Sequence, residues 1–322
     1  MKTGIFLLTE NFNSNAHATI MSDLDIACYA EDLGFDEVWF AEHHFNAFSV
    51  IPNPTLMMAY VAAKTTRIRL GSAAFLAPFY HPTRLAEEIA TLDNLSNGRI
   101  DVGFAKGGFT LDMEYFAKSV ELLREELFHN VKEIDNSLTR NKTLMPKPLQ
   151  KKVPIYIATF STKETIEFAA NNGYGLMFSQ GATVDECVSA CALYKEIAGF
   201  DPEAVLMRVF YIAKTSTEAY ERAVIATDHF VKSMRSLNKS GSQPTFNEAN
   251  YEALLLRRYE FFDAKKFMDA AIVGSVEDSI EKILEIKRRI KNLHLVLKPA
   301  STDTTQTKEV LKIFSEQIKP NI

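Results

Sequence analysis

Short runs of β-branched and aromatic residues alternate with helical patterns along almost the whole chain. Between 113 and 128, for example, apolar residues recur every three or four positions, which is typical of a helix with one buried face. The runs that favour strands lie at 3–9, 36–41, 68–75, 100–105, 153–158, 175–179, 204–213 and 293–297. Repeated strand-then-helix units predict a parallel sheet with helices packed outside it. About eight such units in a chain of 322 residues favour an α/β fold of the (β/α)8 TIM-barrel type over an open sheet.

We expect residues 1–322 to form a single barrel domain with inserted loops. Two segments interrupt the alternation: residues 131–152, which are polar and contain Pro146 and Pro148, and residues 236–252. Both are predicted to be inserted loops. Loops of this length in a compact domain often act as lids or binding elements, and a solvated excursion without a role is the alternative.

The composition excludes several classes of function. The net charge is −5, and no basic run interleaved with aromatic residues indicates nucleic-acid binding. No apolar stretch approaches the ~20 residues that span a bilayer, and the apolar part of the N-terminus is too short for a signal peptide. We therefore expect a cytoplasmic protein without membrane contact. Cys187 and Cys191 share a helix face, but no second Cys or His pair has matching spacing, so we expect buried thiols and no metal site.

Three ionisable residues follow the second predicted strand at once. The stretch 39–45 reads Trp-Phe-Ala-Glu-His-His-Phe, so the apolar run ends in Glu42, His43 and His44. Folding alone gains little from such groups, whereas a barrel enzyme places its chemistry where strands end. Adjacent strand residues point to opposite faces, which disfavours a two-histidine metal site. A neutral histidine here suits acid–base catalysis, and a packed histidine bonded to a carbonyl is the alternative.

Other predicted strand ends carry small, basic or hydroxyl residues. The small residues at 71–74 let the backbone approach a flat ligand closely, or else pack tightly against a helix. Lys106 stands beside two glycines after the fourth strand and could contact an anion. Ser161 and Thr162 open a helix after the fifth strand, where N–H groups and hydroxyls bind anions. The spacing of Ser161 and Glu164 also fits an ordinary capping box.

Two further features favour structural roles or exclude other chemistries. His81 precedes a proline that opens a helix, so it either lines a pocket or caps, and Arg99 favours a structural ion pair. The chain lacks the glycine-rich dinucleotide fingerprint after its first strand, the phosphate-binding P-loop and the nucleophile elbow. Rossmann, P-loop and α/β-hydrolase chemistry are therefore disfavoured.

The motifs and their order along the chain resemble those of the bacterial luciferase-like flavin-dependent monooxygenases. The chain resembles the luciferase alpha subunit more than the beta subunit. The resemblance covers nearly the whole chain and rests on Gly34-Phe35-Asp36, Val38-Trp39, Glu42-His43-His44-Phe45, Gly71-Ser72-Ala73-Ala74, His81-Pro82, Leu92-Asp93, Leu95-Ser96, Gly98-Arg99 and Val273-Gly274-Ser275. It implies a (β/α)8 barrel that binds FMN at the C-terminal face of its strands.

The resemblance also implies roles for individual residues. His43 would be the catalytic histidine, with Glu42 and His44 orienting or buffering it. The flavin phosphate would be held by Lys106, Ser161 and Thr162, and the ring would be lined by Ala73, Ala74 and Ser179. The family's non-proline cis peptide maps to the bond between Ala73 and Ala74. The chain departs from alpha subunits at Ala105, Lys106, Phe160 and Gln180, which favours a single-component or homodimeric monooxygenase over a light-emitting enzyme.

The implied reaction is the insertion of one oxygen atom from O2 into a small organic substrate, using reduced FMN. A separate NAD(P)H:flavin reductase would supply the reduced flavin, because this chain has no dinucleotide fingerprint. Two alternatives stay open: an F420-dependent oxidoreductase on the same scaffold, and a non-catalytic flavin-binding subunit. The intact Glu42, His43 and His44 argue against the second.

Overall fold

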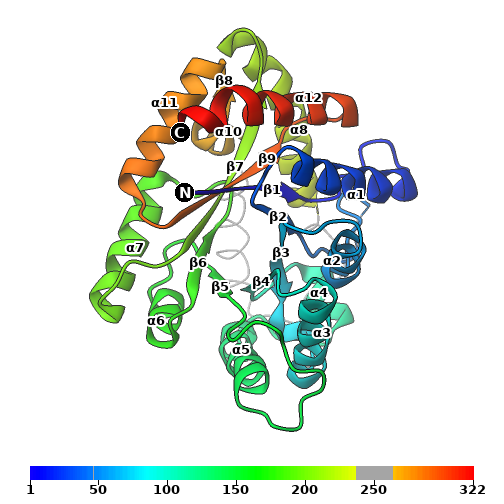
Figure 1. The fold of residues 1–322 in the computed structure, drawn as a ribbon, viewed down its shortest axis with the longest axis vertical. Helices are drawn as coiled ribbons and strands as arrows, with labels where there is room; N and C mark the ends of the chain where they lie inside the picture. Colours follow the sequence, from blue (N-terminus) through cyan, green and yellow to red (C-terminus); the bar gives the residue numbers. More distant parts are fainter. Residues whose placement is uncertain (46, 237–263) are drawn as a thin grey trace.

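Parallel strand pairing runs once around the molecule and closes on itself in a computed structural model, which describes residues 1–45, 47–236 and 264–322 (Figure 1). The strands are β1 (Lys2–Leu7), β2 (Glu37–Phe40), β3 (Arg69–Leu76), β4 (Ile100–Ala105), β5 (Ile155–Ala158), β6 (Gly175–Phe178), β7 (Ala204–Ile212), β8 (Ile272–Gly274) and β9 (Leu293–Pro299). Strands β1 to β6 pair in sequence, β6 pairs with β7, β7 with β9, and β9 with β1. The ring of β1–β7 and β9 is a (β/α)8 barrel.

Helices surround the barrel on its outside (Figure 1). They are α1 (Ala16–Asp32), α2 (Pro54–Ala62), α3 (Pro82–Leu95), α4 (Thr110–Tyr115), α5 (Leu123–Thr139), α6 (Lys163–Asn172), α7 (Val184–Ala198), α8 (Ser216–Ser236), α10 (Ala264–Ala270), α11 (Val276–Arg289) and α12 (Thr304–Ile313). None of the helices in the described ranges is long and apolar enough to cross a lipid bilayer.

The predicted fold class is confirmed strand by strand. Each expected β run contains one strand of the barrel, and the small discrepancies lie at the ends of the runs. The sequence pattern missed β8, a three-residue strand that pairs only with the last residues of β7. A strand this short is too brief to show an alternating pattern.

Two predicted boundaries on the β4–β5 connection are wrong. The helix expected at 113–128 is divided, because the chain turns between the end of α4 and the start of α5. Ala117 has a φ of 52°, and a left-handed residue cannot continue a right-handed helix. The loop expected at 131–152 begins only after Thr139, since Val131, Ile134 and Leu138 are buried on one face of α5. Beyond its first residue, the loop expected at 236–252 lies outside the described residues.

Arg99 has a structural role, but its contacts differ from the expected ion pair. The side chain is 9% exposed and donates hydrogen bonds to the backbone oxygens of Ala62, Thr65, Ile68 and Ser96. These carbonyls belong to the end of α2, the approach to β3 and the end of α3. Arg99 therefore joins three segments at the N-terminal end of the barrel, where carbonyl oxygens replace a carboxylate as its partners.

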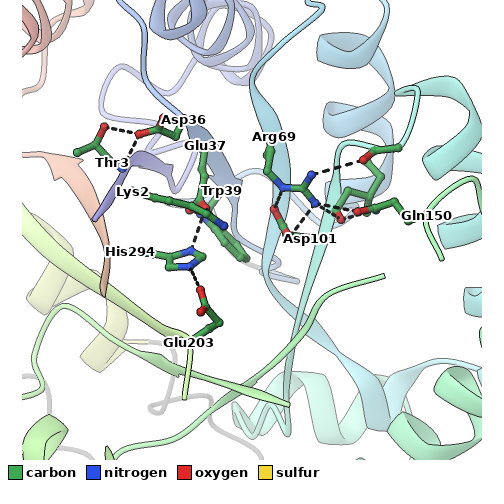
Figure 2. A network of polar contacts seen from close by, with 12 residues as sticks. Lys2, Thr3, Asp36, Glu37, Trp39, Arg69, Asp101, Gln150, Glu203 and His294 are labelled. Carbon is green, nitrogen blue, oxygen red and sulfur yellow. Dashed lines mark hydrogen bonds and ion pairs between the residues drawn. The ribbon is translucent and has the colours of Figure 1, made fainter. Parts of the chain in front are cut away.

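Charged side chains fill the N-terminal end of the barrel interior (Figure 2). Glu37, the first residue of β2, is fully buried and accepts a hydrogen bond of 2.9 Å from the indole nitrogen of Trp39. The ring of His294 lies between two carboxylates. Its Nδ1 is 2.9 Å from Glu37 Oε1 and its Nε2 is 2.7 Å from Glu203 Oε2. The ring and the two carboxylates thus form one ionic group that joins β2 to β9, in which Glu37 and His294 are buried and Glu203 is exposed.

A second ionic group lies beside the first, between β3 and β4. The guanidinium of Arg69 donates to both oxygens of Asp101, at 2.6 and 3.0 Å, and also to Gln150 at 3.1 Å (Figure 2). Asp101 is 1% exposed, so an unpaired carboxylate there would be strongly unfavourable. The pairing explains why ionisable residues are tolerated inside this end of the barrel.

The surroundings of His294 favour its charged form. Burial alone would lower the pKa of this imidazole, but the carboxylates of Glu203 and Glu37 outweigh burial and raise the pKa to about 9. A histidine whose pKa is raised on folding stabilises the folded state fully below its ordinary pKa of about 6.5, and this contribution disappears as the pH rises through the folded value.

We predict that His294→Gln removes a pH-dependent part of the stability. The free energy of unfolding of the wild type, measured in urea, should lose about 3 kcal/mol from this group between pH 6 and pH 9.5, because the pKa of His294 is raised to about 9. The variant lacks the titrating imidazole, so the gap between the two curves should narrow as the pH rises. His81→Gln, at an exposed position, is the matched control and should follow the wild type. Parallel curves for wild type and His294→Gln would contradict the assignment.

Candidate active site

A cavity of about 350 Å³ opens at the C-terminal ends of the barrel strands. Residues from the ends of β1 to β7 line it, including Phe6 of β1, Met177 of β6 and Met207 of β7. Phe230 of α8 and Phe267 of α10 complete the wall from outside the barrel. Its surface is therefore mostly apolar and aromatic, as in sites that bind small organic molecules and cofactors.

Most of the site residues predicted from the sequence meet in this cavity. Those that line it are Glu42, His43, Ala73, Ala74, Lys106, Thr162 and Ser179. His44 and Ser161 are not among its lining residues. The positions agree with the C-terminal face implied by the resemblance, while the chemical role of each residue stays a prediction.

Glu42 is held by three donors although it is only 2% exposed. Its Oε1 lies 2.8 Å from the Nε2 of His44, and its Oε2 accepts from the hydroxyl of Tyr80 at 2.8 Å and from the backbone N–H of Leu76 at 3.3 Å. Burial raises the pKa of Glu42, and these donors offset only part of the increase. The carboxylate is thus fixed in orientation at the cavity wall.

His43 faces the same cavity and is neutral around pH 7. Burial and, to a smaller extent, the nearby His44 lower the pKa of its imidazole to about 4. The ring Nδ1 lies 2.7 Å from the hydroxyl oxygen of Ser49, and the ring edge packs near Phe109, with centroids 6.2 Å apart. A neutral imidazole in an apolar cavity can accept or relay a proton near neutral pH.

His44 points away from the cavity and into an aromatic cluster. Its ring centroid is 5.0 Å from that of Phe116 and 6.4 Å from that of Phe79. Only one of the two adjacent histidines lines the cavity, as expected from the alternation of side chains along extended backbone, and a catalytic role of His44 stays a prediction. His44 contacts Glu42, whereas the resemblance implied that it orients or buffers His43.

Ala73 and Ala74 form one side of the cavity through backbone and methyl groups. They are joined by a cis peptide bond, as the resemblance implied. The pairing of β3 with β4 shifts register between Ser72 and Phe75, so this short segment leaves the regular ladder. Two small side chains here leave room for a flat group to approach the backbone.

Basic and hydroxyl side chains are also among the residues that line the cavity. Lys106 follows β4, Arg124 begins α5, and Thr162 is the N-cap residue of α6. The side chain of Thr162 makes no capping hydrogen bond, and the capping box expected from Ser161 to Glu164 does not form. Ser161 is exposed and is not among the residues that line the cavity, and its role at the phosphate stays a prediction. The helix start and two cations together suit an anionic group such as a phosphate.

The sequence reasoning missed two polar side chains in the cavity wall. Thr159 and Gln180 are 5% and 4% exposed, and in the described part of the chain neither Thr159 Oγ1 nor Gln180 Oε1 has a hydrogen-bond partner. A buried polar atom without a partner is unfavourable unless a ligand completes it. Both directly follow a predicted strand, where a barrel enzyme places its functional residues, so their position in the sequence could have indicated them. Nothing in the local pattern marked Ser49, Tyr80 or Arg124.

Comparison with known proteins decides the family. The model of the luciferase-like monooxygenases matches residues 1–290. The chain belongs to the luciferase-like monooxygenase family. One relative is the oxygenase component of the flavin-dependent trigonelline monooxygenase of Acinetobacter baylyi. It is 27% identical over 81% of this chain and 78% of that protein. The alkanal monooxygenase alpha chain of Photorhabdus luminescens is 30% identical over 62% of this chain and 59% of its own length.

Several solved structures share the whole fold with this member of the luciferase-like family. Monooxygenase RslO1 from Streptomyces bottropensis has a TM-score of 0.84 at 24% identity and covers 99% of both chains. The oxygenating constituent of 3,6-diketocamphane monooxygenase from Pseudomonas putida, solved with FMN, has a TM-score of 0.78 at 19% identity over 100% and 98% of the two chains. An F420-dependent secondary alcohol dehydrogenase has a TM-score of 0.75 at 20% identity over 100% and 99%. At these identities the likeness concerns the barrel alone.

We predict that Tyr80→Phe destabilises this luciferase-like barrel by about 1.5–3 kcal/mol, because it removes a hydrogen bond to a buried charge. The loss should be larger at pH 8 than at pH 5, since the missing donor raises the pKa of Glu42 further and penalises only the ionised form. Denaturant unfolding at the two pH values measures it. Tyr174→Phe, which removes a 2.9 Å bond to the half-buried Asp135, is the control and should cost about 1 kcal/mol or less. Equal losses in both variants would contradict a buried charge at Glu42.

Proposed function

We propose that this protein uses reduced FMN and O2 to insert one oxygen atom into a small organic substrate. The observation that carries the proposal is the mostly apolar cavity at the strand ends, which Glu42 and His43 line together with Ala73 and Ala74. Membership of a family of flavin-dependent monooxygenases supports the reaction class. The whole chain would serve as one catalytic barrel.

The lining residues fit a flavin in both shape and polarity. The small residues Ala73 and Ala74 leave space for a flat ring, and the unpartnered oxygens of Thr159 and Gln180 would complete their hydrogen bonds on its polar edge. Lys106 and Thr162 would hold the phosphate, with Arg124 close by and Ser179 beside the ring. Reduced FMN, when bound, supplies the two electrons with which O2 gives one oxygen atom to the substrate and one to water.

The side chains of the chain itself would manage protons and exclude water. His43 lines the cavity and its imidazole is neutral, so it would accept a proton from the substrate and later give the proton back. Glu42 would set the electrostatic environment of the cavity wall, and His44 would hold the Glu42 side chain in place. The aromatic wall, including Phe109 and Phe230, would keep water from the reacting atoms.

Two other functions remain to be separated by experiment. An F420-dependent oxidoreductase is favoured by one related fold, the F420-dependent alcohol dehydrogenase. A non-catalytic flavin-binding subunit is disfavoured by the buried pair of Glu42 and His43 at the cavity. The visible spectrum of the cofactor that copurifies with the protein distinguishes FMN from F420. Turnover with chemically reduced FMN distinguishes an enzyme from a binding subunit.

The proposed reaction needs a partner that reduces flavin. One relative is named as an oxygenase component, which supports a separate NAD(P)H:flavin reductase as the source of reduced FMN. We further expect a homodimer, as the resemblance implies, and a cytoplasmic location. Sedimentation of the purified protein tests the oligomeric state.

We predict that His43→Ala lowers substrate oxygenation at least ~10²-fold, as expected when an acid–base group is lost, while the dissociation constant for FMN changes by no more than a few-fold. Product formation with chemically reduced FMN and flavin fluorescence titration are the two measurements. His81→Ala is the matched control, because His81 is exposed at the start of α3 and does not line the cavity. Unchanged product formation in His43→Ala would remove this residue from the mechanism.

We predict that Lys106→Ala weakens FMN binding by about 10- to 100-fold, the effect of losing one charge-assisted contact to a phosphate. The same variant should bind riboflavin, which lacks the phosphate, as well as the wild type does. Lys118→Ala is the control, because Lys118 pairs with Glu126 at 2.9 Å and is not a lining residue. An equal loss for FMN and riboflavin would show that Lys106 supports the cavity without contacting the phosphate.

A further inference from the structure

The loop after His43 folds back onto the continuation of β1. The backbone N–H of His43 donates to Ile51 O at 3.0 Å, so the loop closes on itself. Asn11 N donates to Phe48 O at 2.6 Å and Val50 N donates to Thr9 O at 3.1 Å, forming an antiparallel bridge on either side of Ser49. Ser49 is thereby fixed to the barrel by backbone bonds on both sides.

The direction of the hydrogen bonds at Ser49 follows from its acceptor. Ser49 is 1% exposed, and its hydroxyl oxygen lies 2.5 Å from the carbonyl oxygen of Leu8. A carbonyl oxygen can only accept, so the single hydroxyl hydrogen of Ser49 points to Leu8. Towards the His43 ring, 2.7 Å away, the same hydroxyl can then only accept. The hydrogen of the neutral imidazole must therefore sit on Nδ1.

We propose that Ser49 is a positioning residue that holds His43 as the Nδ1–H tautomer and turns a bare Nε2 towards the cavity. The inference rests on the proposed function for its consequence, although the tautomer itself can be measured without turnover. Ser49 is not a lining residue, while His43 is, so the ring edge opposite the Ser49 contact faces the cavity.

The tautomer of His43 determines whether its Nε2 accepts or donates a proton in the first step of the reaction. A bare Nε2 accepts a proton or a hydrogen bond from a substrate, whereas an Nε2–H would only donate. The ring is neutral, so it has no second hydrogen to offer until it has accepted one. Ser49 thus sets His43 as a base at the start of the reaction. The carbonyl of Leu8, in the segment that follows β1, is the group that fixes the orientation of the hydroxyl.

Nitrogen-15 NMR of the full-length wild-type protein, labelled at histidine, tests the tautomer directly. His43→Gln identifies the His43 signals by their loss. We expect a protonated Nδ1 and an unprotonated Nε2 for His43 at pH 7. A spectrum with the hydrogen on Nε2 overturns the proposal, whatever the activity of the protein.

Ser49→Ala tests whether the hydroxyl is the cause. We expect the Nε2–H form of His43 to appear, and substrate turnover to fall at least ~10-fold with FMN binding unchanged. Ser96→Ala is the matched control, because the buried Ser96 hydroxyl likewise donates to a carbonyl, Asp93 O at 3.1 Å, and accepts from an N–H, that of Arg99 at 3.2 Å. It lies at the opposite end of the barrel and should leave the His43 signals unchanged.

The outcomes separate this inference from the proposed function. An unchanged tautomer in Ser49→Ala overturns the positioning role, even if turnover falls. A changed tautomer together with the turnover loss supports it, and Ser49→Thr, which keeps a hydroxyl, should then restore the Nδ1–H signal. If the wild type has the Nδ1–H form but no variant oxygenates any substrate tested, the tautomer assignment stands and the proposed function fails.

Discussion

The closed ring of parallel strand pairs is the constraint on which the rest of this structure depends. Every pair in the ring is parallel, so all the strands end at one rim of the barrel. Residues far apart in the sequence, such as Glu42 after β2 and Gln180 after β6, therefore line one cavity. The ring closes through β7, whose nine residues are long enough to pair with β6, β9 and, at its end, β8.

The two ends of the barrel differ in how completely their polar groups are partnered. At the N-terminal end, His294 lies between Glu37 and Glu203, and Arg69 lies against Asp101, so each charge has a counter-charge within 3 Å. Such groups are tolerated only because they are paired, and they stabilise one arrangement of strands. At the C-terminal end, the oxygens of Thr159 and Gln180 in the cavity wall have no partner among the described residues. A ligand in that cavity would complete the hydrogen bonds of these two oxygens, in line with the proposed site.

The sequence predicts the repeating part of this protein well and the irregular part poorly. Strand periodicity and strand-end position gave the barrel and brought Glu42 and His43 to the cavity, because both depend on local pattern. The break in the helix near Ala117 depends on one left-handed residue, which no periodicity reveals. Ser49 contributes through a loop that folds back on β1, a long-range contact that a single sequence does not encode visibly. The cis bond after Ala73 came from family resemblance alone.

The two adjacent histidines lie on opposite sides of the backbone at the cavity wall. Neighbouring residues in extended backbone point to opposite sides, so only His43 reaches the cavity while His44 turns outward. His44 still acts on the cavity through Glu42, because its Nε2 lies 2.8 Å from a carboxylate that lines the wall. The rings of Phe79 and Phe116 pack around the His44 ring beside that contact. The two histidines of the Glu-His-His motif therefore have different surroundings: His43 lines the cavity, and His44 contacts the carboxyl group of Glu42 that also lines it.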